Sequence, residues 1–381
     1  MESRTTVPVG EDQSEVGPED DFTGLKSAIL EAALDQPRII GATAPCPGRL
    51  KASPEDFRVT EVPAYEPCGE GDHLFIEVEK RDVSAEELVN QVARRLNIAR
   101  GDVGVAGMKD RFAVTRQFLS VPGSCEEQIA DIDGGGITVL SAKRHTNKLR
   151  TGHLKANRFE IVVRDAPDQL TLTAAATSEL LKSKGMPNFF GPQRFGRDGS
   201  TLELGLNLLT GRTTKKAIPP RRRKFLLRLA LSSVQSALFN RVVAIRMRSG
   251  RFDRLISGDV AAKVDSGGPF VVQDVDAEQH RFDEGEIVPT GPISGPKMRS
   301  PQSDAATLET AVLDEFGLTS EDFRRFPKLT TGTRRPLMVR VKDLEIEPVS
   351  DGTKFQFMLP PGSYATVLMS QFITSETTAD E

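Results

Sequence analysis

The chain has 381 residues, which is long enough for two domains that each bury a substantial core. Its net charge of −4 is the sum of acidic ends and a basic middle section. The first 40 residues hold nine acids and three bases and the last seven hold three acids, so residues 41–374 carry a net charge of +5.

The three cysteines lack a Cys-x-x-Cys pair, which argues against a disulfide framework or a zinc site and favours a reducing compartment. No apolar run approaches the roughly 18 residues of a membrane span, and the acidic start lacks the order of a signal peptide. We therefore expect a cytoplasmic protein with no membrane segment.

The two ends of the chain have the composition of tails. Residues 1–42 mix Glu, Asp, Ser, Gly and Pro with few aromatic residues, so they bury too little surface to offset the entropy of ordering. The sequence predicts a disordered acidic tail at 1–42 and a flexible tail at 375–381. The first tail either keeps the protein in solution or competes with nucleic acid for the basic part of the chain.

The first regular elements follow from periodicity. Residues 74–79 alternate as a half-exposed strand does. Ser84 and Glu87 form a capping box, and apolar residues then repeat every four positions, so 84–97 is predicted to be a helix. The short apolar run 103–106 reads as a strand, and the chain leaves it at Gly107.

The segment that follows places one acid, Asp110, between two cations, Lys109 and Arg111. Opposite charges favour an ionised carboxylate, and loops that leave rigid elements often carry reacting groups. Asp110 is therefore a candidate nucleophile or base. The alternative is a structural ion pair in a turn, because surface ion pairs are common and nearly neutral in energy.

Further elements are expected along the rest of the chain. The pattern predicts a strand at 159–164, a helix at 170–184, strands at 337–341 and 355–359, and a short helix at 365–373. The section 285–302 is rich in Pro and Gly and reads as loop rather than core.

Two stretches are free of acids, which indicates a polyanionic partner. Residues 204–252 contain twelve cations, among them Arg221, Arg222, Arg223 and Lys224, and residues 134–159 contain Lys148 and Arg150. The alternative is that the two stretches form solvent-exposed helix and loop faces. Their positive charge would then be hard to balance locally, because the stretches contain no acids.

Metal and cofactor sites find no support in the motifs. The four histidines are not paired with another ligand at helical spacing, and neither a dinucleotide-binding nor a phosphate-binding glycine loop occurs. We expect chemistry that uses ordinary side chains, with no metal and no cofactor.

Several segments, taken together and in order, resemble the TruD family of pseudouridine synthases. The segment from Gly107 to Gln117 is similar to the family's Gly-x-Lys-Asp-Arg-x-Ala-x-Thr-x-Gln motif. The other matching segments are Pro54–Glu61, Gly71–His73 with Lys80, Asn147–His153 with Asn157–Phe159, Phe189–Gly196, Leu255–Asp259, Gly291–Gly295, Gly332–Arg335 and Leu359–Thr366. The resemblance covers about residues 50–373.

The resemblance implies an α+β fold. A pseudouridine synthase catalytic domain with a mixed, largely antiparallel sheet would be built from residues 43–184 and 332–374, at both ends of the chain. An α+β TRUD domain would be inserted at 185–331, with the active site in a basic cleft between the two.

The resemblance also implies an activity, the isomerisation of a uridine in transfer RNA, at position thirteen of the D-arm, to pseudouridine. Asp110 would be the catalytic residue, attacking C1′ of the sugar or removing a proton from C2′. The expected substrate-binding residues are Phe57, Asn157, Phe159 and Tyr364, with Phe159 stacking on the flipped base. The expected supporting or RNA-binding residues are Lys109, Arg111, Lys148, Arg150, Arg194, Arg221, Arg222, Arg223 and Lys224. No cofactor and no obligatory protein partner is implied.

Two other classes of function remain open. A non-catalytic RNA-binding protein or RNA chaperone would keep the basic blocks without needing Asp110. A small-molecule lyase or isomerase would use Asp110 without needing the acid-free blocks.

Overall fold

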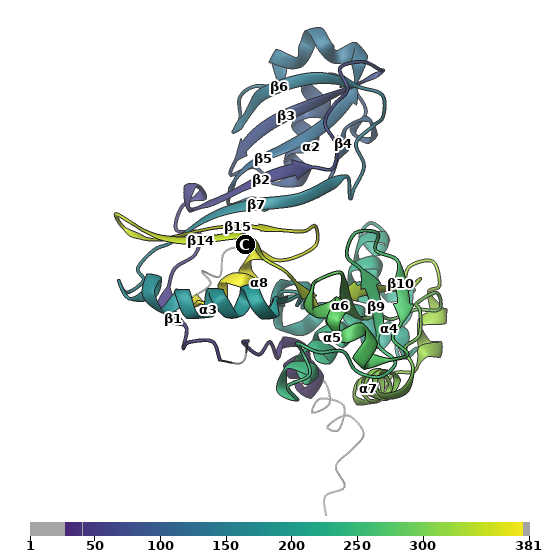
Figure 1. Ribbon diagram of the computed structural model, residues 1–381. Helices are drawn as coiled ribbons and strands as arrows, with labels where there is room; N and C mark the ends of the chain where they lie inside the picture. The colour runs from purple at the N-terminus through teal and green to yellow at the C-terminus, as the bar shows by residue number, and fades with distance from the viewer. Residues whose placement is uncertain (1–26, 40, 376–381) are drawn as a thin grey trace, which may run out of the picture.

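A large mixed sheet organises the molecule (Figure 1). The structure, a computed structural model, describes residues 27–39 and 41–375. The sheet has eight strands in the order β14-β15-β7-β2-β5-β3-β6, with β4 paired to β5. Its strands are β2 (Phe57–Pro63), β3 (His73–Arg81), β4 (Gly104–Val105), β5 (Val114–Pro122), β6 (Ile137–His145), β7 (Leu154–Val163), β14 (Lys342–Val349) and β15 (Gly352–Leu359).

Both ends of the chain contribute to this sheet. The C-terminal strand β15 pairs antiparallel with β7, with Phe357 opposite Phe159, and β7 pairs antiparallel with β2. Among the described strand pairs of this sheet, only β2 and β5 run parallel to each other. The predicted α+β class, with a mixed and largely antiparallel sheet, is confirmed.

Two groups of helices cover the sheet. Helix α2 (Ala85–Arg95) packs its apolar residues against β3 and β5, and the Ser84 hydroxyl accepts a hydrogen bond from the Glu87 backbone N–H at 3.1 Å. Helices α3 (Leu170–Lys184) and α8 (Ala365–Met369) pack in the larger core with β7 and β15. The predictions for α2 and α3 are confirmed, and α3 has the predicted bounds.

The region between β8 (Met186–Pro187) and β13 (Met338–Val339) folds apart from the large sheet (Figure 1). The strands β8 and β13 pair with each other, so the chain leaves and returns at one place. The helices of this region are α4 (Ser200–Leu209), α5 (Arg223–Arg248), α6 (Val275–Asp283) and α7 (Ser303–Glu315). Its sheet, in the order β10-β9-β11-β12, consists of β9 (Val260–Lys263), β10 (Pro269–Val271), β11 (Ile287–Ile293) and β12 (Thr333–Pro336).

Two glycines of the family motifs allow a close backbone crossing near this junction. A Cβ at Gly295 would lie 2.2 Å from the Thr330 carbonyl oxygen, and one at Gly332 would lie 2.6 Å from the Gly295 oxygen. Gly332 also has a φ of +86°, which L residues with a side chain rarely adopt. These glycines are explained by packing alone.

Two secondary-structure predictions were wrong. The section 285–302 is not all loop, because β11 lies within it as a buried central strand. Its prolines are tolerated because β11 changes partner, with residues 287–289 paired to β9 and 290–293 paired to β12. The helix expected at 365–373 ends at Met369, and the chain continues as β16 (Ile373–Ser375), which pairs parallel with β1 (Cys46–Gly48).

Part of the predicted N-terminal tail is folded. Residues 27–34 form a helix, and Ile29, Ala33 and Ile39 are buried in the larger core. The Asn240 side chain on α5 donates to the Ala33 carbonyl at 3.1 Å. Residues 1–26 and 376–381 lie outside the described part of the chain. Within the described ranges, no helix is long and apolar enough to cross a membrane.

Acids from outside the acid-free block balance part of it, which agrees with the expectation that the block cannot be balanced locally. On α5, Arg241 and Arg248 pair with Asp35, and Arg246 pairs with Asp259. The Arg246–Asp259 pair is nearly fully buried at 2.7 Å, and Arg246 also donates to the carbonyls of Arg251 and Arg254. The buried Arg246 holds the fold, whereas Arg241 and Arg248 are more exposed and already paired with an acid.

We predict that Asp259→Ala lowers the free energy of unfolding by about 3–5 kcal/mol, because it leaves the Arg246 guanidinium buried and unpaired. Urea denaturation would measure the change. Arg248→Ala is the control, since it removes an exposed ion pair and should leave the transition unmoved. The double variant Arg246→Met/Asp259→Leu should recover much of the loss. Equal effects of Asp259→Ala and Arg248→Ala would contradict the prediction.

Candidate active site

Asp110 lies in the loop between β4 and β5, as expected from the strand that precedes it. Its carboxylate is about half exposed, at 53%, and its Oδ2 accepts a hydrogen bond from Lys51 Nζ at 3.0 Å. An ammonium at this distance stabilises negative charge on the carboxylate. The loop therefore presents a reachable carboxylate oxygen beside a cation.

The cations that pair with Asp110 differ from those expected. Lys109 turns inward and pairs with Glu61, and both side chains are nearly fully buried, whereas Arg111 pairs with Asp82 at 3.3 Å. Neither Lys109 nor Arg111 forms an ion pair with Asp110 within the described part of the chain, so the alternative of a structural ion pair between these neighbours is not borne out. Lys51, six residues before Phe57, is the partner that the sequence pattern did not reveal.

Lys80 supports the loop from beneath. Its side chain is fully buried, and its Nζ donates to the backbone carbonyl of Asp110 at 2.6 Å and to that of Val83 at 2.8 Å. The pKa of Lys80 is lowered to about 8, mainly by burial. The charge of nearby Lys109 contributes to this shift, while the charges of Asp110 and Asp82 oppose it. The backbone of Asp110 is thus tied to strand β3.

An aromatic column lies next to Lys51. Lys51 Nζ sits 4.9 Å from the centroid of the Phe57 ring, which meets Phe159 edge to face at 6.2 Å. Phe159 stacks on Phe357 at 5.2 Å. The exposed fractions of Phe57 and Phe159 are 2% and 7%. The structure therefore brings the two expected residues together, but with little ring face open to solvent.

Unpartnered polar atoms gather on the same face of the sheet. Asn157 pairs in register with Glu61, the acid that holds Lys109, and Thr115 pairs in register with Lys80. Within the described residues, Asn157 Oδ1, Thr115 Oγ1 and Gln117 Oε1 are buried and have no hydrogen-bond partner. Leaving such an atom unpaired costs about 1–3 kcal/mol, so these acceptors mark a place where a polar ligand or water binds. Sequence reasoning selected Asn157 but not the other two.

Tyr364 belongs to a second cluster, beyond the end of β15. Its ring lies 6.1 Å from the Phe190 ring, and the guanidinium of Arg335 covers Phe190 at 4.2 Å. Arg194 approaches the same ring at 5.8 Å. Burial lowers the pKa of Arg335 to about 10, and Arg194 adds to the shift while Tyr364 opposes it. Since β15 ends at Leu359, which pairs with Asn157, the two clusters lie toward one end of the same strands.

The remaining predicted cations occupy two other places. Lys148 and Arg150 lie in the loop between β6 and β7, where the Gly152 N–H donates to the Ala106 carbonyl at 2.8 Å. This loop therefore borders the one that carries Asp110. Arg221, Arg222, Arg223 and Lys224 lie at the start of α5, and no ion pair within the described part of the chain involves them.

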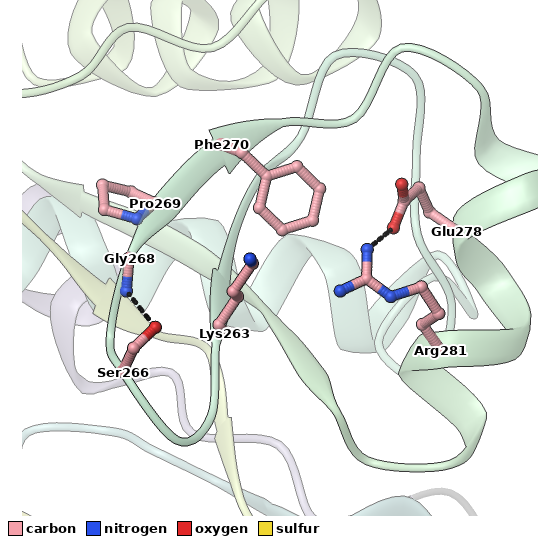
Figure 2. A pocket seen from close by; sticks show the side chains of 7 residues that line it. All are labelled: Lys263, Ser266, Gly268, Pro269, Phe270, Glu278 and Arg281. Atoms are coloured by element: carbon pink, nitrogen blue, oxygen red, sulfur yellow. Dashed lines mark hydrogen bonds and ion pairs between the residues drawn. The ribbon is translucent and has the colours of Figure 1, made fainter.

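Two surface hollows lie in the inserted region, away from Asp110. One is lined by Lys263, Phe270, Glu278 and Arg281 (Figure 2), and the other by residues that follow α5, including Arg251 and Arg254. Arg281 in the first hollow is already paired with Glu278 at 2.7 Å. Neither hollow includes a residue that the sequence selected as catalytic or substrate-binding. Among residues 27–39 and 41–375, no group of three or more His, Cys, Asp or Glu side chains could hold a metal ion.

Comparison with known proteins gives the family. The family model described as tRNA pseudouridine synthase D (TruD) matches residues 35–219 and 215–372. The tRNA pseudouridine synthase D of Anaeromyxobacter dehalogenans is 43% identical over 329 residues, which cover 86% of this chain and 93% of that protein. The protein of the same name from Thermus thermophilus is 40% identical over 330 residues, covering 86% and 89%.

A solved structure agrees with the fold. The crystal structure of a Methanosarcina mazei protein, described as a TruD, matches with a TM-score of 0.71 at 24% identity, covering 90% of this chain and 97% of that chain. The resemblance drawn from the motifs is confirmed, and the chain belongs to the TruD family of tRNA pseudouridine synthases.

Proposed function

We propose that this protein isomerises a uridine of transfer RNA to pseudouridine, at position thirteen of the D-arm, with Asp110 as the reacting carboxylate. Family membership supports the reaction and the class of RNA. One observation of the structure supports the assignment of Asp110 as the reacting carboxylate. Asp110 is half exposed, 3.0 Å from the Lys51 ammonium, on a loop whose backbone is tied to the buried Lys80.

The reaction needs only a carboxylate and an arrangement that holds the base. The bond between C1′ and N1 of the uracil breaks and a bond between C1′ and C5 forms, after which C5 loses its proton and N1 gains one, so nothing is gained or lost overall. Asp110 would either bond to C1′ and leave again, or remove a C2′ proton and return it. In both routes Lys51 would stabilise the charge on Asp110 before and after the step.

The unpartnered acceptors beside Asp110 suit the polar edge of uracil. That edge carries one donor, the N3–H, and two carbonyl oxygens. Asn157 Oδ1 is buried without a partner and would accept from N3–H, while its amide nitrogen would donate to a carbonyl. Thr115 and Gln117 offer further acceptors on the same face.

Aromatic groups would hold the faces of the flipped base. Phe57 and Phe159 lie beneath Lys51, and Tyr364 lies beside Phe190. Because Phe159 is 7% exposed and stacks on Phe357, its contact with a base would require the ring to turn or the column to open. Phe57, Phe159 and Tyr364 remain proposed substrate-binding residues on this basis.

The transfer RNA would meet cations that form no ion pair within the described part of the chain, although Lys148 donates to the Gly101 carbonyl and Arg223 to the Ile218 carbonyl. Lys148 and Arg150 border the Asp110 loop, and Arg194 lies in the Tyr364 cluster. Arg221, Arg222, Arg223 and Lys224 would add phosphate contacts from the inserted region. Lys109 and Arg111 would act by shaping the loop through Glu61 and Asp82. A cytoplasmic location stays a prediction from composition.

We predict that Asp110→Asn lowers pseudouridine formation by about four orders of magnitude or more, because the amide can neither attack C1′ nor take a proton. Its affinity for an unmodified transfer RNA transcript should stay within about threefold, since phosphate contacts supply most binding. Base mapping by carbodiimide and primer extension would measure the product. Asp165→Asn is the matched control, because Asp165, like Asp110, is an exposed aspartate paired with a cation, in its case Arg49. Clear turnover by the Asp110→Asn protein would overturn the assignment.

The lowered pKa of Lys80 gives a stability test. In the folded state Lys80 loses its proton near pH 8, whereas in the unfolded chain it keeps the proton to about pH 10.5. Between these values the unfolded state binds more protons, so stability rises with pH. The free energy of unfolding of the wild type, minus that of Lys80→Met, should therefore increase by about 2–3 kcal/mol from pH 7.5 to pH 10.

Urea titrations at several pH values would measure that difference. Lys182→Met, which replaces a half-exposed lysine on α3, is the control and should show a constant difference. A difference for Lys80→Met that is flat or falls with pH would show that Lys80 is charged and solvated in the folded protein.

The cations at the start of α5 can be tested through salt. Replacing Arg221, Arg222, Arg223 and Lys224 by Ala should weaken binding and flatten the plot of log affinity against log salt by about 0.7–0.9 for each phosphate that is no longer neutralised. Turnover of bound RNA should change little. Replacing Lys182 and Arg324, which sit in exposed ion pairs, is the control. An unchanged slope in the fourfold variant would show that this cluster is a solvated face.

A further inference from the structure

Met108, in the Asp110 loop, is unusually exposed for an apolar side chain. Its exposed fraction is 82%, above that of every other large apolar side chain in the described ranges, including Leu172 at 79% and Phe225 at 64%. Apolar surface left in water forgoes the stabilisation that burial would give. Because Met108 lies two residues before the proposed reacting carboxylate, its exposure is expected to serve the RNA.

The backbone around Met108 is held in place. The Ala106 carbonyl accepts from the Gly152 N–H at 2.8 Å, Lys109 is tied to the buried Glu61, and the Asp110 carbonyl accepts from the buried Lys80. The residues on both sides of Met108 are therefore fixed, and Lys109 points into the protein while Met108 points out. The exposed thioether is a feature of an anchored loop.

A single apolar group of this kind suits insertion into a base stack. A docked protein would need a contiguous apolar patch, and the other large exposed apolar side chains come from other elements of the fold. In contrast, nucleic-acid-binding proteins insert single side chains, methionine among them, between base steps. Methionine is flexible and its polarizable sulfur contacts aromatic rings favourably.

The distance to Asp110 fits the geometry that base flipping demands. Two residues along a chain separate Cα atoms by at most about 7 Å. A uridine whose sugar reaches Asp110 has left its place in the RNA stack within that range, and the vacated space must be filled or closed. The bordering loop with Lys148 and Arg150 supplies cations for the flanking phosphates.

We propose that Met108 is a positioning residue that enters the RNA stack where the target uridine has left it. The proposal rests on the proposed function, because it assumes a flipped uridine at Asp110. Met108 would hold the RNA open and keep the uridine in the site, without contact to the reacting atoms. Shape and apolar character are what this role requires, so leucine should replace methionine and alanine should not.

The test compares Met108→Ala and Met108→Leu with the wild type on an unmodified transfer RNA transcript. Alanine should lower kcat/KM by about tenfold to a hundredfold, as expected when one unstacked base step loses its filler, and leucine should stay within about threefold. A second transcript carries an abasic residue next to the target uridine, which weakens the local stack. On that RNA the alanine defect should shrink severalfold, because little stacking opposes flipping.

A fluorescence measurement separates this proposal from the proposed function, since it needs no turnover. A transcript with 2-aminopurine beside the target uridine reports unstacking when the wild type binds, and the increase should be absent with Met108→Ala and kept with Met108→Leu. Leu172→Ala, which removes a similarly exposed side chain from α3, is the matched control and should behave as wild type.

Three results would overturn this role of Met108. They are a Met108→Ala protein within twofold of the wild type in kcat/KM, an equal defect for Leu172→Ala, or an alanine defect that is as large on the abasic transcript. If the wild type unstacks the probe but forms no pseudouridine, the proposed function fails while the role of Met108 in opening the RNA stands.

Discussion

The buried ammonium of Lys80 is the constraint on which the geometry of the site depends. A buried charge is stable only where acceptors surround it, and here the acceptors are two backbone carbonyls, those of Val83 and Asp110. A side-chain acceptor could rotate away, but a carbonyl fixes the course of the chain. The loop must therefore pass over β3 at one place, which places the Asp110 side chain above the sheet and beside Lys51.

The rest of the fold brings the other groups to that place. Lys51 precedes β2, Asn157 lies on β7 and Tyr364 follows β15, and these three strands are neighbours only because the C-terminal segment joins the sheet beside β7. The pairing of β8 with β13 makes this possible, since it brings the chain back next to its point of departure. The inserted region can then differ in size without disturbing the sheet.

Much of the fold could be predicted from local pattern, and the errors have physical causes. Helix α3 was predicted with its observed bounds from local pattern, and in the structure Gly185 caps its end with a φ of +77°. Strand β11 was missed because its prolines argue against a central strand, and only its change of partner makes them acceptable. The helix at 27–34 was missed although six of its eight residues are apolar, because the mean composition of the acidic segment 1–42 hides an apolar run this short.

The candidate site shows the same limit. The motifs singled out Asp110 and Asn157, but adjacency in sequence does not show which charges meet, because Lys109 faces inward to Glu61 and Lys51 pairs with Asp110. The contact with Lys51 joins residues 59 positions apart and depends on how β2 is approached, which no local pattern encodes. The same holds for α5, where acids from distant segments neutralise Arg241, Arg246 and Arg248.

The residues that support the loop differ in burial from the residues that the loop presents to solvent. The supporting groups Lys80, Lys109 and Glu61 are nearly fully buried, whereas Asp110 is half exposed and Met108 almost fully exposed. An isomerisation without cofactor or net transfer depends on holding a reacting group in position against a substrate that must be distorted. If Met108 enters the RNA stack as proposed, the contacts of Lys109 with Glu61 and of the Asp110 carbonyl with Lys80 would transmit the resulting force to strands β2 and β3.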